Sequence, residues 1–335
     1  MMKKILMVAA MAGLVAFVAC GPKTPTAEEA YQAADEAYNK AATSREKVQI
    51  LKDFLAKYPD TEHTAELVET AVSHYLEDLK KPEEAWTFIR SVEASVKDFV
   101  TLRRVRAASL PILGKLKKAD EIENVIAALA DKPLTYDEHM AVSNACVDAG
   151  RWNLALNHAQ ASFKFATPES FKADNPGREF PPDRLERYVN MRKAECLVNS
   201  AWTQANLGRF EESLKTFEEA RAATVFSFVG ASEPPFDLYL GKTLLMQKEY
   251  EKAMEVLTPA AVFAGDPDAL DAMMSAYEES LKGSVEGFDA YLEGLREKLA
   301  RTVTDFTLPD YQGTPHTYSD LQKGRVVLLS FWFPT

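Results

Sequence analysis

The sequence holds few residues of the kinds that bind metals. Three cysteines and five histidines are spread over 335 residues. No two histidines stand three or four positions apart, and neither a His-Glu-x-x-His motif nor a Cys-x-x-Cys pair occurs. The usual sequence signatures of a zinc site are therefore absent. We expect no metal site and no cofactor.

Motifs that depend on glycine are also missing. The chain has 14 glycines, and none of them falls in a phosphate-binding loop, a Gly-x-Ser-x-Gly turn or a dinucleotide fingerprint after a strand. No pair of carboxylates stands out from the general acidity. We therefore predict no catalytic residue in the first three hundred positions.

Positive charge is in deficit. Lysine and arginine together number 39 against 50 aspartates and glutamates, which gives a formal net charge of −11. No basic stripe occurs, whereas nucleic-acid binding is driven mainly by concentrated Lys and Arg. We therefore exclude a nucleic-acid partner. Hydrophobic residues make up 47% of the chain, enough for a sizeable core, and the length suits about two domains.

No apolar run is as long as the 20 or so residues of a membrane-spanning helix. The longest uncharged run near the N-terminus, residues 5–18, follows two lysines and suits a signal peptide. It leads into Phe17-Val18-Ala19-Cys20 and then a polar stretch with two prolines. This pattern resembles the lipobox of bacterial lipoproteins, with Phe17 where leucine is usual.

That resemblance implies a signal peptide over residues 1–19, cleavage before Cys20, lipid on the Cys20 sulfur, and a tether over residues 20–26. It places the protein in the bacterial cell envelope, bound to a membrane through its acyl chains and facing the periplasm or another extracytoplasmic space. The alternatives are a secretory peptide with an incidental cysteine and an uncleaved anchor.

From residue 27 to about residue 303 the pattern is helical. Segments 27–42, 44–58 and 64–79 carry apolar residues at intervals of three and four and are separated by short breakers. No alternating strand pattern occurs before Phe306. The fold class predicted for this region is all-α.

Three stretches of this region align with one another: AGRWNLALNHAQAS (149–162), LGRFEESLKTFEEA (207–220) and QKEYEKAMEVLTPA (247–260). Each has a turn, then an aromatic residue, then a small residue three positions later. The aromatics are Trp152, Phe210 and Tyr250, and the small residues are Ala155, Ser213 and Ala253.

The alignment resembles the tetratricopeptide repeat, and Leu240-Gly241 falls where the first helix of a unit carries its Leu-Gly pair. FLAKYPDTEHTAE (54–66) and KKPEEAWTFI (80–89) suggest further degenerate copies. The resemblance implies a solenoid of helical hairpins over residues 27–303, whose surface binds a protein client. A Pro-rich stretch, 166–184, interrupts the spacing.

Several residues allow two interpretations. Cys146 and Cys196 are either a disulfide or reactive thiols, or else small buried side chains, which is how free cysteine usually behaves in a core. His158 is most simply a packing or surface residue. The segment 225–237 carries Phe226, Phe228 and Phe236 and either grips a ligand on the concave surface or plugs a gap between repeats.

From about residue 304 the sequence pattern changes from helical to extended. An extended Phe-x-Leu-Pro-Asp is followed by a turn at Gln312-Gly313, a helix start at Ser319 and a buried strand over residues 326–333. This stretch resembles the opening of the redoxin family, which contains TlpA-like thiol–disulfide oxidoreductases and the peroxiredoxins (AhpC/TSA). The matching positions are Phe306, Leu308, Pro309, Asp310, Gly313, Ser319, Leu321, Gly324, Val326, Val327, Leu328, Phe331 and Trp332.

The resemblance implies that residues 304–335 begin a thioredoxin-like α/β domain. In TlpA-like members the strand ends in Phe-Trp-Ala-x-x, and the first cysteine of Cys-x-x-Cys follows directly. Residues 331–335 occupy those five positions, so we expect the nucleophile to come next. The hypotheses for the end of the chain are a selenocysteine codon read as a stop, a fragmentary gene, and a functional short protein. We expect the 335-residue chain itself to be redox-inactive.

Two functions follow from these patterns. The first is a membrane-anchored extracytoplasmic thiol–disulfide oxidoreductase whose helical region recruits a client. The alternative is a non-enzymatic tetratricopeptide lipoprotein that acts as an envelope assembly adaptor. The purely structural alternative for the tail is an isolated β-hairpin that caps the solenoid.

Overall fold

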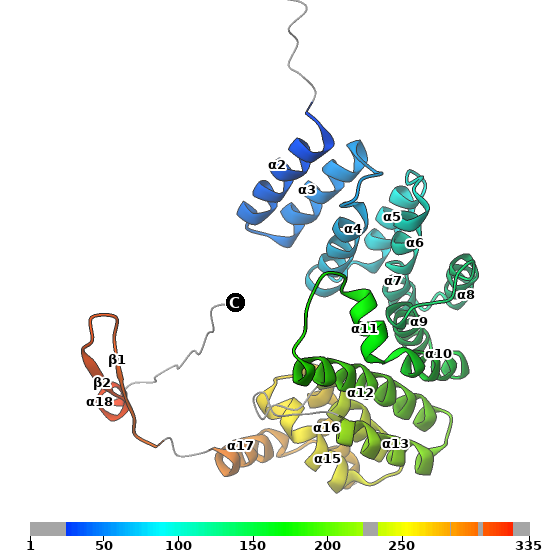
Figure 1. Cartoon of the computed structure of the whole chain (residues 1–335). Helices are drawn as coiled ribbons and strands as arrows, with labels where there is room; N and C mark the ends of the chain where they lie inside the picture. The colour runs from blue at the N-terminus through cyan, green and yellow to red at the C-terminus, as the bar shows by residue number, and fades with distance from the viewer. Residues whose placement is uncertain (1–24, 224–233, 282, 301–303, 324–335) are drawn as a thin grey trace, which may run out of the picture.

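The computed structural model describes residues 25–223, 234–281, 283–300 and 304–323. Helices fill this part of the chain from Ala27 to Leu299, and its strands come only after residue 306, as the sequence predicted (Figure 1). The helices follow one another as antiparallel pairs that form a curved array.

The first two pairs are made by α2 (Ala27–Lys40) with α3 (Ser44–Lys57) and by α4 (Thr64–Ser73) with α5 (Pro82–Glu93). A π-helical turn, η1 (His74–Asp78), extends α4. Thr26 and Thr43 begin α2 and α3 with capping boxes, in which each threonine hydroxyl accepts from the backbone N–H of the glutamate three residues on. The helix starts predicted at residues 27, 44 and 64 are confirmed.

The next pairs are less regular. α6 (Phe99–Ala107) and α7 (Leu110–Lys115) both contact α8 (Ala119–Leu129). They are two helices and not one because Pro111 lacks the backbone N–H that a continuous helix would need. α9 (Tyr136–Asp148) pairs with α10 (Trp152–Phe165). The Pro-rich stretch 166–184 then supplies a short inserted helix, α11 (Pro168–Asp174).

The second half of the array contains its longest helix. α12 (Pro182–Asn206, 25 residues) pairs with α13 (Phe210–Ala223) and also packs on α10 and α14. α14 (Pro234–Met246) pairs with α15 (Tyr250–Thr258), which continues as the π-helical turn η2 (Pro259–Phe263). α16 (Pro267–Ser280) and α17 (Phe288–Leu299) end the helical part.

Five of the turns between helices share one form. The first residue of each is left-handed, with φ between 54° and 76°: Lys80, Lys117, Gly150, Gly208 and Lys248. The next residue donates its backbone N–H back into the first helix, as Arg151 does to the Cys146 carbonyl (2.8 Å) and Lys118 to that of Leu113 (2.9 Å). This is the Schellman bond that satisfies an orphan helix-end carbonyl. The three turns predicted at Gly150, Gly208 and Lys248 are therefore confirmed, and Lys80 and Lys117 add two more.

Small residues sit where the helices of a pair touch. Ala155, Ser213 and Ala253 are fully buried at equivalent places in the second helices, as predicted, and Ala85 occupies the same place in α5. The Ser213 hydroxyl donates to the Ala201 carbonyl of the facing helix (2.7 Å). At Gly241 an added Cβ would overlap the Leu257 side chain, so the Leu-Gly pair does permit a close approach.

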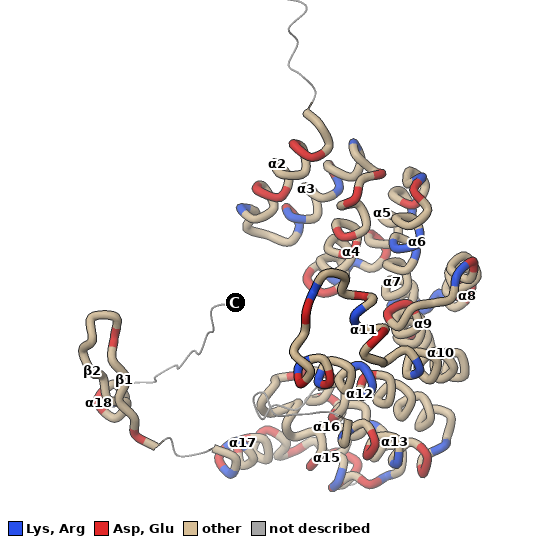
Figure 2. The backbone as a smooth tube through the Cα atoms, viewed as in Figure 1, with Lys and Arg blue, Asp and Glu red and all other residues tan. Residues whose placement is uncertain are grey.

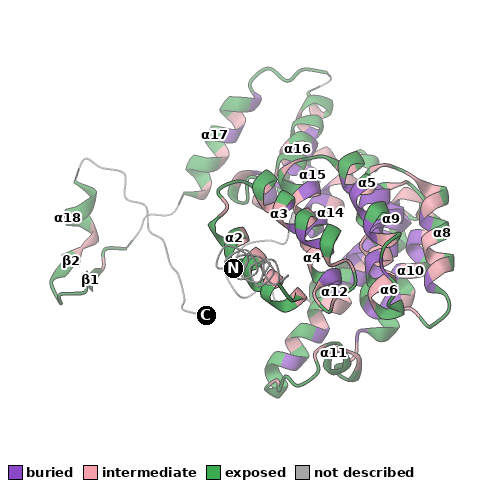
Figure 3. Cartoon of the chain, turned by 90° about the horizontal axis from the view of Figure 1, so that it is seen from above, coloured by how far each residue is buried: buried purple, intermediate pink, exposed green. Residues whose placement is uncertain are grey.

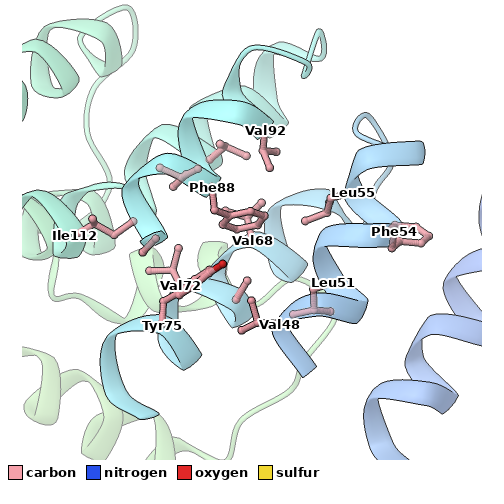
Figure 4. Close-up of a cluster of buried hydrophobic side chains, with 14 of the residues drawn as sticks. Val48, Leu51, Phe54, Leu55, Val68, Val72, Tyr75, Phe88, Val92 and Ile112 are labelled. Atoms are coloured by element: carbon pink, nitrogen blue, oxygen red, sulfur yellow. The ribbon is translucent and has the colours of Figure 1, made fainter. Parts of the chain in front are cut away.

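The core runs through the array as a series of clusters between pairs. In the N-terminal cluster Val68 and Phe88 lie between α3, α4 and α5, and Ile112 adds a contact from α7 (Figure 4). Figure 3 shows the buried residues on the faces where helices meet. Within the described residues, no helix combines the length and apolar character that crossing a bilayer needs.

The last described segment is a β-hairpin followed by a short helix. β1 (Thr307–Pro309) pairs antiparallel with β2 (Pro315–Thr317), with Leu308 opposite His316, and α18 (Tyr318–Gln322) follows. Figures 1 and 3 both draw it apart from the helices. The predicted extended stretch, turn and helix start are thus present.

Candidate functional site

A groove crosses the helical array at its middle. It encloses about 620 Å³ and is lined by first helices of successive pairs: α7, α9, α12 and α14, together with α11. Second helices contribute nothing to the described lining, so the groove lies on one side of the array. The lining includes Lys115, Asn144, Val147, Asp148, Phe171, Tyr188, Met191, Arg192, Glu195, Val198, Asn199, Phe236 and Tyr239.

One wall of the groove is apolar. Val147 on α9, Val198 on α12 and Phe236 on α14 are all at least nine-tenths buried. Tyr239 stacks on Trp202 with ring centroids 4.9 Å apart and planes 8° apart, which fixes the tyrosine ring. This wall offers an apolar side chain a rigid place to pack.

Two asparagines of the groove lining are hydrogen-bonded to each other. Asn199 on α12 is 6% exposed, and its Nδ2 donates to Oδ1 of Asn144 on α9. That bond uses one donor and one acceptor of the two amides. It leaves the N–H groups of Asn144 and the carbonyl oxygen of Asn199 without a side-chain partner in the described part of the chain. A donor and an acceptor side by side match the C=O and N–H of a peptide group.

Arg192 on α12 also lines the groove. Its guanidinium lies between two aromatic rings, with Cζ 4.3 Å from the centroid of Tyr136 and 4.8 Å from that of Phe171. It also donates to Asp174 Oδ2 (2.7 Å), and its side chain is only 12% exposed. Arg192 thereby joins α12 to α9 and α11, and it holds the inserted helix at the groove.

The other polar side chains of the groove also have hydrogen-bond or ion-pair partners. The Tyr136 hydroxyl donates to Glu195 Oε2 (2.9 Å), and burial raises the pKa of Tyr136 far above its ordinary value. Lys115 pairs with Asp148 at 3.0 Å. The groove therefore carries both signs of charge in internal pairs, and it offers no concentrated charge for a highly charged ligand.

Aromatic and sulfur-containing side chains form the open rim. Tyr188 stacks on Phe171 (centroids 5.1 Å, planes 8° apart), and Phe180 meets both rings edge-on. Tyr188 and Met191 are 37% and 46% exposed although they are large and apolar. Exposed aromatic and methionine side chains beside a groove are typical of protein-binding surfaces.

Positive charge is not concentrated along the described groove lining. Lys and Arg are interspersed with Asp and Glu along the described helices (Figure 2). The groove's own cations, Lys115 and Arg192, are both paired with aspartates. A phosphate backbone would find little positive potential here.

Cys146 and Cys196 are free, buried thiols, so the structure contradicts the disulfide interpretation. Burial raises the pKa of each thiol to about 11. Cys196 Sγ lies 3.6 Å from Met140 Sδ inside a small core cluster. Both residues behave as small core side chains.

The aromatic segment 225–237 is described only in part. Phe226 and Phe228 lie outside the described residues. Phe236 is 3% exposed and packs edge-on against Phe217 of α13, with centroids 5.6 Å apart. It acts as a plug between helix pairs, and its other side forms part of the groove wall.

The structure places the described redoxin-like positions on or next to the hairpin and on the helix α18 that follows it. Asp310 accepts backbone N–H groups from Gln312 (2.9 Å) and Thr314 (2.8 Å), and Gly313 takes the positive φ of the turn (83°). Leu308 and Leu321 are 55% and 46% exposed. The lipidation candidate Cys20 and the positions Gly324, Val326, Val327, Leu328, Phe331 and Trp332 lie outside the described residues.

Sequence reasoning missed two side-chain groupings. His139 and His158, 19 positions apart, are brought together by the α9–α10 hairpin. Glu28, Glu62 and His63 have ligand atoms within 4.8 Å of one another, and they are the one trio among the described residues whose spacing suits a metal ion. Two of these three are exposed carboxylates, and the ring of His63 is stacked on Tyr31. Contacts between separate helices leave no local sequence signal.

Comparison with known proteins adds little. No family model matches the chain, and no curated protein matches it. A solved structure that resembles it is a tetratricopeptide repeat protein from Parabacteroides merdae ATCC 43184, with 11% sequence identity and a TM-score of 0.40 over 75% of this chain and 98% of that one. The repeat architecture of the present chain is visible in its own turns and helix pairs.

Proposed function

We propose that this protein is a lipid-anchored interaction scaffold of the bacterial cell envelope that binds an extended segment of a client polypeptide in its groove. The observation that carries the proposal is the amide pair of Asn144 and Asn199. It lies between an apolar wall and an aromatic rim on a surface built from first helices.

The amide pair suits a peptide backbone. An extended segment has backbone C=O and N–H groups with no internal partner, and a buried polar group left unpaired is costly. The N–H of Asn144 can donate to a client carbonyl while the carbonyl of Asn199 accepts from a client N–H. Such bonds are independent of client sequence.

The apolar wall and the rim supply selectivity. A client side chain that packs against Val198 and Phe236 buries area without displacing a charge. Tyr188 and Met191 would cover it from the rim. We therefore expect segments with an aromatic or large aliphatic residue, because a few such anchors provide most of the binding energy of an interface.

The test is peptide selection followed by affinity measurement. A phage library of random dodecapeptides is selected on the full chain in detergent, and fluorescence anisotropy gives the affinity of selected peptides for variants. We expect Met191→Glu to weaken binding at least tenfold. Met246→Glu is the control, since Met246 is 43% exposed on α14 but does not line the groove. Equal affinities for the two variants would contradict the proposal.

The anchor and the location rest on the lipobox-like residues before and at Cys20. Metabolic labelling with radioactive palmitate tests them. We expect label and membrane association in the natural protein and loss of both in Cys20→Ser. Membrane association that survives this substitution would rule out the lipid anchor.

A second candidate is thiol–disulfide exchange, which is supported by the redoxin-like residues 304–335 and their hairpin. The two described thiols are poor candidates for it, because reactive thiols need a lowered pKa and access, and both of these are buried with raised pKa values. The test is insulin-disulfide reduction by the natural gene product, including anything encoded after residue 335. If that folded product is inactive, only the interaction-scaffold function remains of the two candidates.

A further inference from the structure

The α9–α10 hairpin brings two histidines together. His139 is on α9 and His158 on α10, with their Nδ1 atoms 3.0 Å apart. The ring centroids are 5.1 Å apart and the planes are inclined by 49°. Both residues are partly buried, so the pair is held in place by helix packing and is still reachable from solvent.

The surroundings keep the pair fixed and uncharged. The Phe165 ring stacks on His139 with centroids 5.7 Å apart. The neighbouring carboxylate, Glu138, is paired with both Nε and a terminal nitrogen of Arg103 (2.6 and 2.8 Å), and its charge only partly offsets the effect of burial on His139. Burial lowers the pKa of both imidazoles, that of His158 to about 4, and metal ligands must be neutral imidazoles.

The separation of the two nitrogens fits a shared ion. With metal–imidazole bonds of about 2.0–2.1 Å, ligand atoms 3.0 Å apart subtend an angle of ~94° at the metal. That angle is close to the right angle between neighbouring ligands in tetragonal copper and nickel sites, and it is narrower than the tetrahedral angle of zinc.

We propose that His139 and His158 form a two-imidazole site for Cu²⁺ or Ni²⁺, with water in the remaining positions. Without the ion, one ring carries the Nδ1 proton and donates it to the other ring. Binding moves that proton to Nε2 of the same ring, through solvent, and each ring turns about its side-chain bonds so that its Nδ1 lone pair points at the ion. No net proton is released from the pair.

The test uses the full chain in detergent with one equivalent of Cu²⁺. Electron paramagnetic resonance should show a tetragonal spectrum with hyperfine coupling to two imidazole nitrogens. The melting temperature should rise with Cu²⁺ and return when EDTA is added. A spectrum with no coupled imidazole nitrogen pair in the unaltered protein would overturn the proposal without any substitution.

Two variants locate the ion. His158→Phe and His139→Gln should each lose the two-nitrogen spectrum and bind Cu²⁺ at least tenfold more weakly. His316→Gln is the matched control, because His316 is a hairpin histidine remote in sequence from the pair, and it should bind like the natural protein. Circular dichroism in EDTA checks that each variant is folded. Retained two-nitrogen binding in His158→Phe, or equal loss in His316→Gln, would refute the assignment.

Discussion

Single buried groups give the protein its clearest chemical signatures. Cys146 and Cys196 are each 0% exposed, and His158 lies at a helix interface with a lowered pKa. The sequence alone favoured small buried cysteines from their helical surroundings, and that interpretation is confirmed. It gave no sign of the histidine contact, because the two rings come from different helices.

The thiols should be inert in the folded protein. Because burial raises both pKa values to about 11, the thiolate fraction near neutral pH is very small. We expect Cys146 and Cys196 to react with Ellman's reagent only after denaturation, as measured by absorbance in a Cys20→Ser background. Rapid labelling of a thiol in the native protein would show that the core opens readily.

Stability should depend on pH through His158. Its folded pKa of about 4 lies below the ordinary value of 6.5, so the unfolded chain binds more protons between these values. The free energy of unfolding should therefore fall as the pH is lowered from about 6.5 to 4. Urea denaturation at a series of pH values measures this fall, which should be smaller in His158→Gln. If the free energy of unfolding of His158→Gln falls with pH as steeply as that of the natural protein, other groups cause the effect.

Helices are joined by turns, and only some of these turns can be recognised from the sequence. Gly150 and Gly208 mark their turns openly, whereas Lys117 adopts the same left-handed conformation with a side chain that gives no such signal. The turn at Lys117 was therefore missed. Likewise, prolines 168, 176, 181 and 182 predicted an interruption but not α11, whose position depends on the contact between Phe171 and Arg192.

The five turns allow a paired test. A non-glycine residue in the left-handed region costs about 1–2 kcal/mol. Lys117→Gly should therefore raise the free energy of unfolding by about 0.5–1 kcal/mol, after the greater freedom of glycine in the unfolded chain is allowed for. Gly208→Lys should lower it by a similar amount. Urea denaturation measures both, and changes of the same sign in the two variants would contradict the shared geometry.

Arg103 connects three elements. It makes a two-point ion pair with Glu138 of α9 and donates to the Leu129 carbonyl at the end of α8 (2.6 Å), and its side chain is 12% exposed. Arg103→Lys cannot reproduce the planar fork and should cost about 1–3 kcal/mol.

The adjacent residue provides the control. Arg104 contacts Glu69 with both side chains about half exposed, so Arg104→Lys should cost less than about 1 kcal/mol. Thermal or urea unfolding compares the two variants. Equal effects would mean that the three-element contact of Arg103 contributes no more than a surface pair.

For the whole molecule, the all-α repeat array could be predicted because each helix pair repeats a local pattern. The groove could not, since Asn144 and Asn199 are 55 positions apart and meet only when consecutive pairs pack. Only a client-binding surface in general was expected. The redoxin-like tail has the predicted extended stretch, turn and helix start, whereas the predicted strand over residues 326–333 lies outside the described residues. Its family membership stays a prediction.

The length of α12 has a consequence for any client. This single helix lines the groove from Tyr188 to Asn199. At 1.5 Å per residue the two lie about 16 Å apart along the helix axis. An extended chain that advances about 3.3 Å per residue would cover that span with roughly five residues. Because an unbroken helix is stiff, the span is fixed, and a client would be selected by the distance between its anchor side chain and the backbone group that the asparagines hold.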